Sequence, residues 1–503
     1  MYKDFTVSEV NEVMQKAWSA FYACKKCSLK QRAHFMRAIA IELEACGDAL
    51  IQTAMSETNL PEARLRGERA RTILQLNQYA DACERGAWME ISIDTAIPDK
   101  NPPKPDVRKM MIPLGPVVVF GASNFPFAYS TAGGDTASAL AAGCPVIVKA
   151  HPAHAQTSEM VATAIEKAAK QCNMPDGIFA HVHGAGFEVG KALVMHQHTK
   201  AVGFTGSYNG GKQLFDWANQ RKEPISVFAE MGSVNPVYLL PEKLNTSASD
   251  IATMYAASIT LGVGQFCTNP GLIIGIESEA LKIFTHDLGK AIQKIAPAPM
   301  LHAGIAKAYK ENKSNALLQD GVHLVAESEM EISSAVANPD GGLRGLPAIA
   351  TVDAKTFLNN PVLHQEVFGP YSLIIRCADK HEMLRVAQQM EGQLTSTLMA
   401  TDNDIHQNEA LIEAVNNTCG RLILNSVPTG VEVCLSMHHG GPFPASTDAR
   451  FTSVGADAIK RFARPICFQN WSNALLPEEL KNENPLKLLR RINNEWTKEH
   501  VVL

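Results

Sequence analysis

The hydrophobic positions at the start of the chain follow helical spacing. Thr6 and Glu9 have the separation of a capping box, which predicts a helix beginning just after Thr6. The apolar positions that repeat every three or four residues are Val10, Val13, Met14, Ala17, Trp18 and Phe21. Similar patterns predict helices over residues 30–57 and 62–83. Prolines at 98, 102, 103 and 105 exclude a regular helix over 94–113 and predict an extended excursion.

A regular alternation of short apolar runs and helical patterns begins at residue 117. The apolar runs are Val117–Phe120, Val146–Lys149, Ile178–His183, Ala201–Thr205 and Ile225–Glu230. The helical patterns between them cover 131–142, 155–171, 188–197 and 210–219. Alternation of strands and helices at this spacing predicts a parallel sheet covered by helices on both faces.

A second, less regular alternation covers about residues 247–424. Its apolar runs are Gly271–Ile276, Tyr371–Ile375 and Arg421–Asn425. The pattern therefore predicts an α/β fold of two domains in tandem. The segment after Trp471 is polar and has one helical pattern, at 484–498. It predicts a tail on the surface rather than a further domain.

Composition narrows the classes of partner and compartment. With 503 residues, the chain has room for two or three domains. A net charge of −5 argues against binding to nucleic acid or to a membrane surface. The apolar runs are far shorter than the roughly 20 residues of a membrane span, and no apolar signal core follows Met1. Eleven cysteines without framework spacing fit reduced thiols, so we expect a cytoplasmic protein.

Two segments carry the candidate chemistry. Gly264-Gln265-Phe266-Cys267 sets a thiol among small residues, where it can attack a carbonyl carbon. Glu230 ends a predicted strand, and a carboxylate there can activate water against a thioester. Together they are suited to oxidising an aldehyde to an acid through a covalent intermediate. Taken alone, such a cysteine is more often a buried small hydrophobe, and such a glutamate a solvated carboxylate.

Six short blocks along the chain resemble the aldehyde dehydrogenase superfamily, and they stand in the order in which that family has them. The blocks are Phe120-Gly121-Ala122-Ser123-Asn124-Phe125-Pro126, Pro145-Val146-Ile147-Val148-Lys149, Gly203-Phe204-Thr205-Gly206-Ser207, Glu230-Met231-Gly232, Gly264-Gln265-Phe266-Cys267 and Glu366-Val367-Phe368-Gly369-Pro370. Six ordered blocks are far more specific than any one of them. The segments 130–140 and 440–446 are similar to the branch of α-ketoglutaric semialdehyde dehydrogenases and a bacterial NADP-dependent fatty-aldehyde dehydrogenase.

The resemblance implies a domain organisation that agrees with the alternation. Residues 1–92 and 114–233 would form a dinucleotide-binding domain around a parallel sheet, and 234–433 an α/β catalytic domain. Residues 93–113 and 434–503 would form a small oligomerisation arm with the C-terminal segment. We therefore expect at least a homodimer, with a homotetramer as the alternative.

The resemblance also assigns the catalytic roles. Cys267 would be the nucleophile, and the amide of Asn124 with the backbone N–H of Cys267 would stabilise the oxyanion. Glu230 would deprotonate the water that hydrolyses the thioester. Without the resemblance, Asn124 before Phe-Pro reads as the start of a turn. A CoA-acylating relative typically lacks the glutamate, and a noncatalytic protein on this fold would have lost one of the three.

The cofactor would be NAD or NADP. By resemblance, Lys149 holds the adenosine ribose, Gly206 and Ser207 bring a helix N-terminus to the pyrophosphate, and Glu366 with Phe368 grips the nicotinamide ribose. Many NAD-preferring relatives have a glutamate three residues after the lysine, but Pro152 stands there in this chain. The NADP-specific relative binds the 2′-phosphate with a threonine and an arginine, and this chain has Pro152 and Phe187 at those positions. Mixed use of both cofactors is therefore the expectation.

The substrate inference is α-ketoglutaric semialdehyde (2,5-dioxopentanoate), oxidised to α-ketoglutarate. The alternative is a medium- or long-chain fatty aldehyde, which needs a long apolar tunnel. A semialdehyde carboxylate calls for an arginine in the tunnel. Arg64, Arg66, Arg69 and Arg71 crowd one helix, and one or two of them could reach a substrate.

We predict no metal site. Cys24 and Cys27 have zinc spacing, but no second pair accompanies them, and Cys24 continues an apolar helical stripe. The pairs His438-His439 and His181/His183 lack neighbouring carboxylates or cysteines in the sequence, which favours structural roles.

Overall fold

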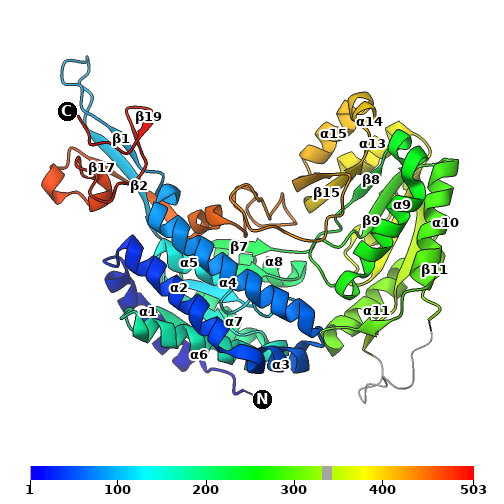
Figure 1. The fold of residues 1–503 in the computed structure, drawn as a ribbon, viewed down its shortest axis with the longest axis horizontal. Coiled ribbons are helices and arrows are strands. Elements are labelled where there is room, and N and C mark those ends of the chain that lie inside the picture. Colours follow the sequence, from blue (N-terminus) through cyan, green and yellow to red (C-terminus); the bar gives the residue numbers. More distant parts are fainter. Residues whose placement is uncertain (1, 331–342, 503) are drawn as a thin grey trace.

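The computed structural model describes residues 2–330 and 343–502. Two helix-covered sheets lie side by side, and a third, smaller sheet projects from the edge of the first (Figure 1). The chain thus has the predicted α/β fold. No helix of the described part is long and apolar enough to cross a membrane.

The first sheet has five parallel strands in the order β5-β4-β3-β6-β7. Its strands are β3 (Val117–Phe120), β4 (Val146–Lys149), β5 (Phe179–Val182), β6 (Ala201–Thr205) and β7 (Ser226–Glu230). The connecting helices are α5 (Gly134–Ala142), α6 (Ala155–Gln171), α7 (Phe187–Met195) and α8 (Tyr208–Asn219). All nine elements fall where the alternation predicted them, within a few residues at each end.

Alternate residues of these strands pack into two separate cores. Val117 and Val119 face one core with α2 (Leu29–Ala45), α5 and α6, while Val118 faces the other with α1 (Val7–Cys24), α7 and α8. Chain order reverses beside β3, because β4 lies on one side of it and β6 on the other. Open parallel sheets bind ligands at the carboxyl ends of the strands flanking such a reversal.

The N-terminal helices pack against this domain. The capping box of α1 is present, with the Thr6 hydroxyl accepting from Glu9 N–H and the Glu9 carboxylate accepting from Thr6 N–H. The pattern over 30–57 forms two helices, α2 and α3 (Gly47–Thr58), since the chain breaks at Gly47 with φ +59°. The helix α4 (Glu62–Arg85) follows, and Gly86 ends it in the left-handed conformation.

The second sheet has seven strands in the order β11-β13-β14-β9-β8-β15-β16, and every pair except β11–β13 is parallel. Its strands are β8 (Val237–Leu239), β9 (Leu272–Ile276), β11 (His323–Glu327), β13 (Ala348–Asp353), β14 (Tyr371–Cys377), β15 (Gln393–Met399) and β16 (Cys419–Leu424). Its helices are α9 (Pro241–Thr260), α10 (Glu279–Gln293), α11 (Ala303–Leu317), α12 (Ala354–Asn359), α13 (Lys380–Gln389), α14 (Asp402–Gln407) and α15 (Glu409–Asn416). A two-stranded ribbon, β10 (Ala298–Pro299) with β12 (Arg344–Gly345), lies beside it.

The projecting sheet joins distant parts of the chain in the order β17-β2-β1-β18-β19 (Figure 1). Its strands are β1 (Ser92–Asp94), β2 (Val107–Pro113), β17 (Ala463–Gln469), β18 (Arg490–Ile492) and β19 (Glu495–Thr497). The proline-rich excursion is extended, as predicted, and β2 pairs along its whole length with β17.

The predicted helix over 484–498 is wrong, because β18 and β19 form a hairpin there. Asn493 and Asn494 take positive φ values of 47° and 75°, which suit a two-residue hairpin turn and stop a helix. The strand β1 offers a parallel partner to β18. Arg490 is fully buried and donates to the carbonyls of Lys481 and Glu499, so long-range contacts decide this segment.

Candidate active site

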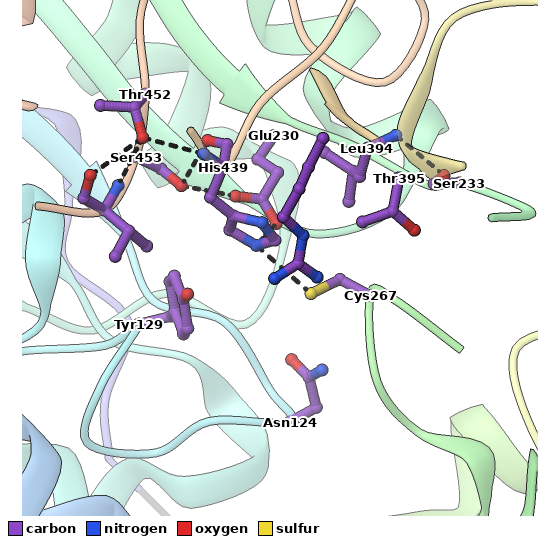
Figure 2. A network of polar contacts seen from close by, with 12 residues as sticks. Asn124, Tyr129, Glu230, Ser233, Cys267, Leu394, Thr395, His439, Thr452 and Ser453 are labelled. Carbon is purple, nitrogen blue, oxygen red and sulfur yellow. Dashed lines mark hydrogen bonds and ion pairs between the residues drawn. The ribbon is translucent and has the colours of Figure 1, made fainter. Parts of the chain in front are cut away.

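Three segments far apart in the sequence bring Asn124, Glu230 and Cys267 together (Figure 2). Glu230 is the last residue of β7, and Asn124 lies in the loop after β3. Cys267 follows η3 (Leu261–Gly264), a short 3₁₀ helix. The sulfur of Cys267 and a carboxylate oxygen of Glu230 lie within 4.8 Å of each other. The convergence that the sequence predicted is therefore present.

Backbone contacts fix the loop that carries Cys267. The side-chain amide of Asn235 donates to the carbonyls of Cys267 and Asn269, both at 2.9 Å. Gly264 has φ +65°, and a Cβ there would lie 2.3 Å from the Gly369 carbonyl. Only glycine fits so close an approach in that conformation. This explains physically why Gly264 precedes the cysteine.

Cys267 as a whole residue is partly exposed, although its thiol is largely surrounded by protein. Burial of the thiol raises its pKa well above the ordinary value, and the negative charges of Glu230 and Glu366 raise it further. Arg71 acts in the opposite direction. The resting group is a thiol, and forming the reactive thiolate requires a proton acceptor in contact with it.

His439 supplies such a contact, and the sequence analysis missed it. Its Nε2 lies 3.5 Å from the Cys267 sulfur and 3.0 Å from Oε1 of Glu230 (Figure 2). The expectation that His438-His439 lack acidic or cysteine neighbours is wrong for His439, because both neighbours come from distant segments. The sequence feature that could have pointed to His439 is its position directly before the family-like segment 440–446.

Glu230 is almost fully buried and hydrogen bonded. The Ser453 hydroxyl donates to its Oε2 at 2.7 Å, and His439 lies at its other oxygen. Burial alone would raise the pKa of Glu230, but His439, Ser453 and the Cys267 thiol together hold it below the ordinary value. Glu230 is therefore a carboxylate at neutral pH, which is the form that can accept a proton.

Asn124 presents its amide beside the sulfur (Figure 2). Its Nδ2 donates to the carbonyl of Gln265 at 3.2 Å, so the amide N–H groups face the Cys267 loop. The guanidinium of Arg64 donates to the Asn124 carbonyl at 2.7 Å and fixes that backbone. An amide N–H group that faces this loop is a donor of the kind that can stabilise an oxyanion.

A second histidine pair also has a carboxylate neighbour that the sequence analysis did not foresee. Oε2 of Glu159 lies 3.0 Å from His181 Nδ1 and 2.9 Å from His183 Nε2. Glu159 belongs to α6, whereas both histidines belong to the region of β5, so only the fold brings them together. The prediction of no metal stays a prediction. Cys24 and Cys27 are buried in the core, as predicted.

Three of the predicted cofactor residues, Lys149, Gly206 and Ser207, lie at the carboxyl ends of strands of the first sheet. Lys149 ends β4, and among the described residues its Nζ has one long hydrogen bond, 3.4 Å to the Ala150 carbonyl, and no carboxylate within 4.0 Å. Ser207 caps α8, accepting from Gly210 N–H, and Gly206 N–H donates to the Glu230 carbonyl. An unpaired cation and a capped helix N-terminus suit a dinucleotide.

Glu366 and Phe368 line a pocket that also borders Ser233 and Gly264, next to the Cys267 loop. Burial raises the pKa of Glu366 to about 8, with only a backbone hydrogen bond from Ser233 opposing it. A buried carboxyl group without a cation is suited to accepting hydrogen bonds from ribose hydroxyls. The residues present thus fit a nicotinamide dinucleotide.

This fold and site indicate a class: an α/β enzyme with a parallel sheet of the dinucleotide-binding type and a cysteine–glutamate pair of the kind suited to carbonyl chemistry. Residues 2–456 match the aldehyde dehydrogenase family. The chain belongs to the aldehyde dehydrogenase family, whose members oxidise aldehydes with NAD or NADP.

Two curated relatives are similar over nearly the whole chain. The α-ketoglutaric semialdehyde dehydrogenase 2 of Azospirillum brasilense is 48% identical over 96% of this chain and 91% of its own length. The α-ketoglutaric semialdehyde dehydrogenase of Acinetobacter baylyi is 43% identical over 99% of this chain and 93% of its own length.

Solved structures have the same fold at low identity. A 1-pyrroline-5-carboxylate dehydrogenase from Thermus with bound NAD has a TM-score of 0.77 at 20% identity, covering 93% of this chain and 86% of that one. A 3,6-anhydro-L-galactose dehydrogenase in complex with NADP has a TM-score of 0.76 at 22% identity, covering 93% and 92%.

Proposed function

We propose that this protein oxidises α-ketoglutaric semialdehyde to α-ketoglutarate with NAD or NADP, through a thioester on Cys267. The proposal is carried by the similarity of 48% and 43% to two enzymes named for that substrate, over nearly the full chain. The contacts of Cys267, Glu230 and Asn124 support the same chemistry, since they gather a thiol, a carboxylate and an amide in one site.

The first step joins the sulfur to the aldehyde carbon. The Glu230 carboxylate can accept the proton of Cys267, and Nε2 of His439 contacts the sulfur at 3.5 Å. The sulfur then forms a bond to the carbonyl carbon, and the carbonyl π electrons become an oxyanion. The Asn124 amide and the Cys267 backbone N–H donate to that oxygen. One donor of this kind is typically worth a factor of roughly 10² to 10³ in turnover.

The second step gives the acid. A nicotinamide cofactor, when bound, would supply the hydride acceptor. The oxyanion re-forms a carbonyl as the carbon loses hydride, and a thioester remains on Cys267. Glu230 removes a proton from water, the oxygen attacks the thioester carbon, and the carbon–sulfur bond breaks. The carboxylic acid leaves and the sulfur regains a proton. A buried carboxylate that is ionised in the resting state is suited to this role.

For the cofactor, we propose contacts by Lys149, Gly206, Ser207, Glu366 and Phe368. Lys149 carries a positive charge with no carboxylate partner among the described residues, so it can pair with ribose or phosphate oxygens. The residue three positions after it is Pro152, which cannot repel a 2′-phosphate. We therefore propose that both NAD and NADP are used.

The alternatives differ in what they require of the site. A fatty-aldehyde dehydrogenase would share Cys267 and Glu230, but its substrate-binding site would be lined by apolar residues. Arginines border the site of this protein. A CoA-acylating enzyme has no use for Glu230 as a base. A noncatalytic protein on this fold would have no reason to keep a hydrogen-bonded Cys267, Glu230 and Asn124.

The test is the ranking of aldehydes by NAD(P)H formation. We expect kcat/KM for α-ketoglutaric semialdehyde to exceed that for succinic semialdehyde, and both to exceed that for decanal. Initial rates at 340 nm with each cofactor measure this directly. A preference for decanal would replace the substrate proposal with the fatty-aldehyde alternative.

We further propose a homodimer, with a homotetramer as the alternative, through the arm of residues 93–113 and 434–503. The strand β17 is the outer strand of the projecting sheet, and β16 is the outer strand of the catalytic sheet, with Leu422 and Leu424 exposed. Light scattering should give at least twice the 54.5 kDa chain mass, and a monomer would refute the proposal.

All eleven cysteines are free, in keeping with a proposed cytoplasmic location.

A further inference from the structure

Positive charge surrounds the nucleophile. Arg64 and Arg71 reach it from α4, and Arg421 reaches it from β16 on the other domain. Within the described residues, no carboxylate oxygen lies within 4.0 Å of these three guanidinium groups. Arg66, on the same helix α4, is paired with Glu62 at 2.7 Å and Asp48 at 2.9 Å. The site thus holds cations that the described part of the chain leaves without acidic partners.

Two of the three arginines are committed to the protein itself. Arg64 donates to the Asn124 carbonyl and lies over the rings of Phe125 and Phe266, 5.0 and 4.6 Å from their centres. It is a positioning residue for Asn124. Arg421 donates through both terminal nitrogens to the loop that follows β16, 2.7 Å to the Pro428 carbonyl and 3.0 Å to the Gly430 carbonyl.

Each of the three arginines has one buried nitrogen without a hydrogen-bond partner among the described residues, namely Nη1 of Arg64, Nε of Arg71 and Nε of Arg421. Arg71 differs from the other two because it donates to no backbone carbonyl of the described chain. Its one hydrogen bond to the described residues is a long one, 3.3 Å from Nη2 to the Tyr129 hydroxyl. Its Nε is buried without a partner. The Tyr129 ring centre lies 6.2 Å from that of His439, and His439 in turn contacts the Cys267 sulfur (Figure 2). Through Tyr129, Arg71 therefore belongs to the surroundings of this site. A buried N–H without a partner is costly, and a ligand oxygen would satisfy it.

We propose that Arg71 determines substrate specificity by binding the carboxylate of the semialdehyde, with Arg421 supplying a second positive charge nearby. The inference rests on the proposed function and adds how that site selects its substrate. A planar guanidinium offers parallel N–H groups that match the two oxygens of a carboxylate. In α-ketoglutaric semialdehyde the carboxylate carbon is four bonds from the aldehyde carbon, so one end can meet Arg71 while the other meets Cys267.

The experiment compares a charged aldehyde with a neutral one in matched variants. Arg71→Gln is assayed with α-ketoglutaric semialdehyde and with pentanal, which has five carbons and no charge, and Arg66→Gln is the control from the same helix. We expect Arg71→Gln to lower kcat/KM for the semialdehyde roughly 10- to 100-fold, mainly through KM, and that for pentanal by less than about 3-fold. Arg71→Lys should recover part of the loss, and Arg66→Gln should change neither.

Binding without chemistry gives a second measurement. Calorimetry of α-ketoglutarate with the Cys267→Ala protein should show a Kd weakened by a similar factor when Arg71→Gln is added. Equal losses for both aldehydes, or no change in either measurement, would overturn the role of Arg71. If Arg71→Gln does not fold, the same criteria apply to Arg71→Lys. A wild-type preference for pentanal or decanal is a different result, which refutes the proposed function instead.

Discussion

Cys267→Ala should abolish aldehyde oxidation, lowering kcat/KM by at least about 10⁴-fold. Removing a nucleophile removes the covalent route itself, and such variants typically lose activity by this order or more. His439, Glu230 and Asn124 would remain in place around an apolar side chain of smaller volume, so the fold should persist. NAD(P)H formation from α-ketoglutaric semialdehyde at 340 nm measures the loss.

Cys434→Ala is the matched control, since Cys434 is exposed and its thiol makes no hydrogen bond within the described residues. It should retain wild-type rates. Because the pKa of Cys267 is raised, its alkylation by iodoacetamide should be slow at neutral pH and should accelerate as the pH rises toward that pKa. Undiminished turnover by Cys267→Ala would refute the thioester mechanism.

Glu230→Gln should stop the reaction after its first half. The substitution keeps the shape of the side chain and its contact with Ser453 but removes the base that activates water. A burst of about one NAD(P)H per site should appear, followed by turnover reduced roughly 10²- to 10⁴-fold. Rapid-mixing absorbance measures the burst, and mass spectrometry of the quenched protein should find the acyl group on Cys267.

The pH dependence of the second half follows from the lowered pKa of Glu230. A base acts when deprotonated, so hydrolysis should be lost only as the pH falls through that pKa, below the ordinary value of about 4.3. It should be nearly constant from neutral pH down to about pH 5.

His439→Gln is the informative comparison with Glu230→Gln, because it should slow the burst itself, by about 10²-fold, rather than trap the thioester. A Glu230→Gln protein without a burst would instead assign Glu230 to the first half.

The local spacing of apolar residues was sufficient to predict most of the secondary structure. Strands β3 and β4 follow from unbroken valine and isoleucine runs between helical stretches, and the period-two packing of Val117, Val118 and Val119 explains why such runs are buried on both faces. The same reasoning was wrong for 484–498. There the helical spacing was weak, and the partner strand β1 lies some 400 residues earlier in the chain.

The ordered motifs were sufficient to find Cys267, Glu230 and Asn124, because each lies in a block whose residues must fit a fixed backbone. Gly264 is an example, since the Gly369 carbonyl leaves no room for a side chain. His439 could not be found this way. A histidine next to another histidine has many structural uses, and nothing in its own segment reveals the sulfur and carboxylate beside it.

The sequence by itself determined the α/β fold, the order of its strands along the chain, and which residues are proposed as nucleophile and base, because these depend on local periodicity and on short motifs. Only the tertiary structure decided which charges face one another. Arg66 and Arg71 lie on the same helix, but Arg66 is paired with two acidic side chains. Arg71 has no acidic side chain within ion-pair distance in the described chain. Electrostatic contacts depend on distance in space, and residues from β7, β16 and α4 acquire those distances only when the domains pack.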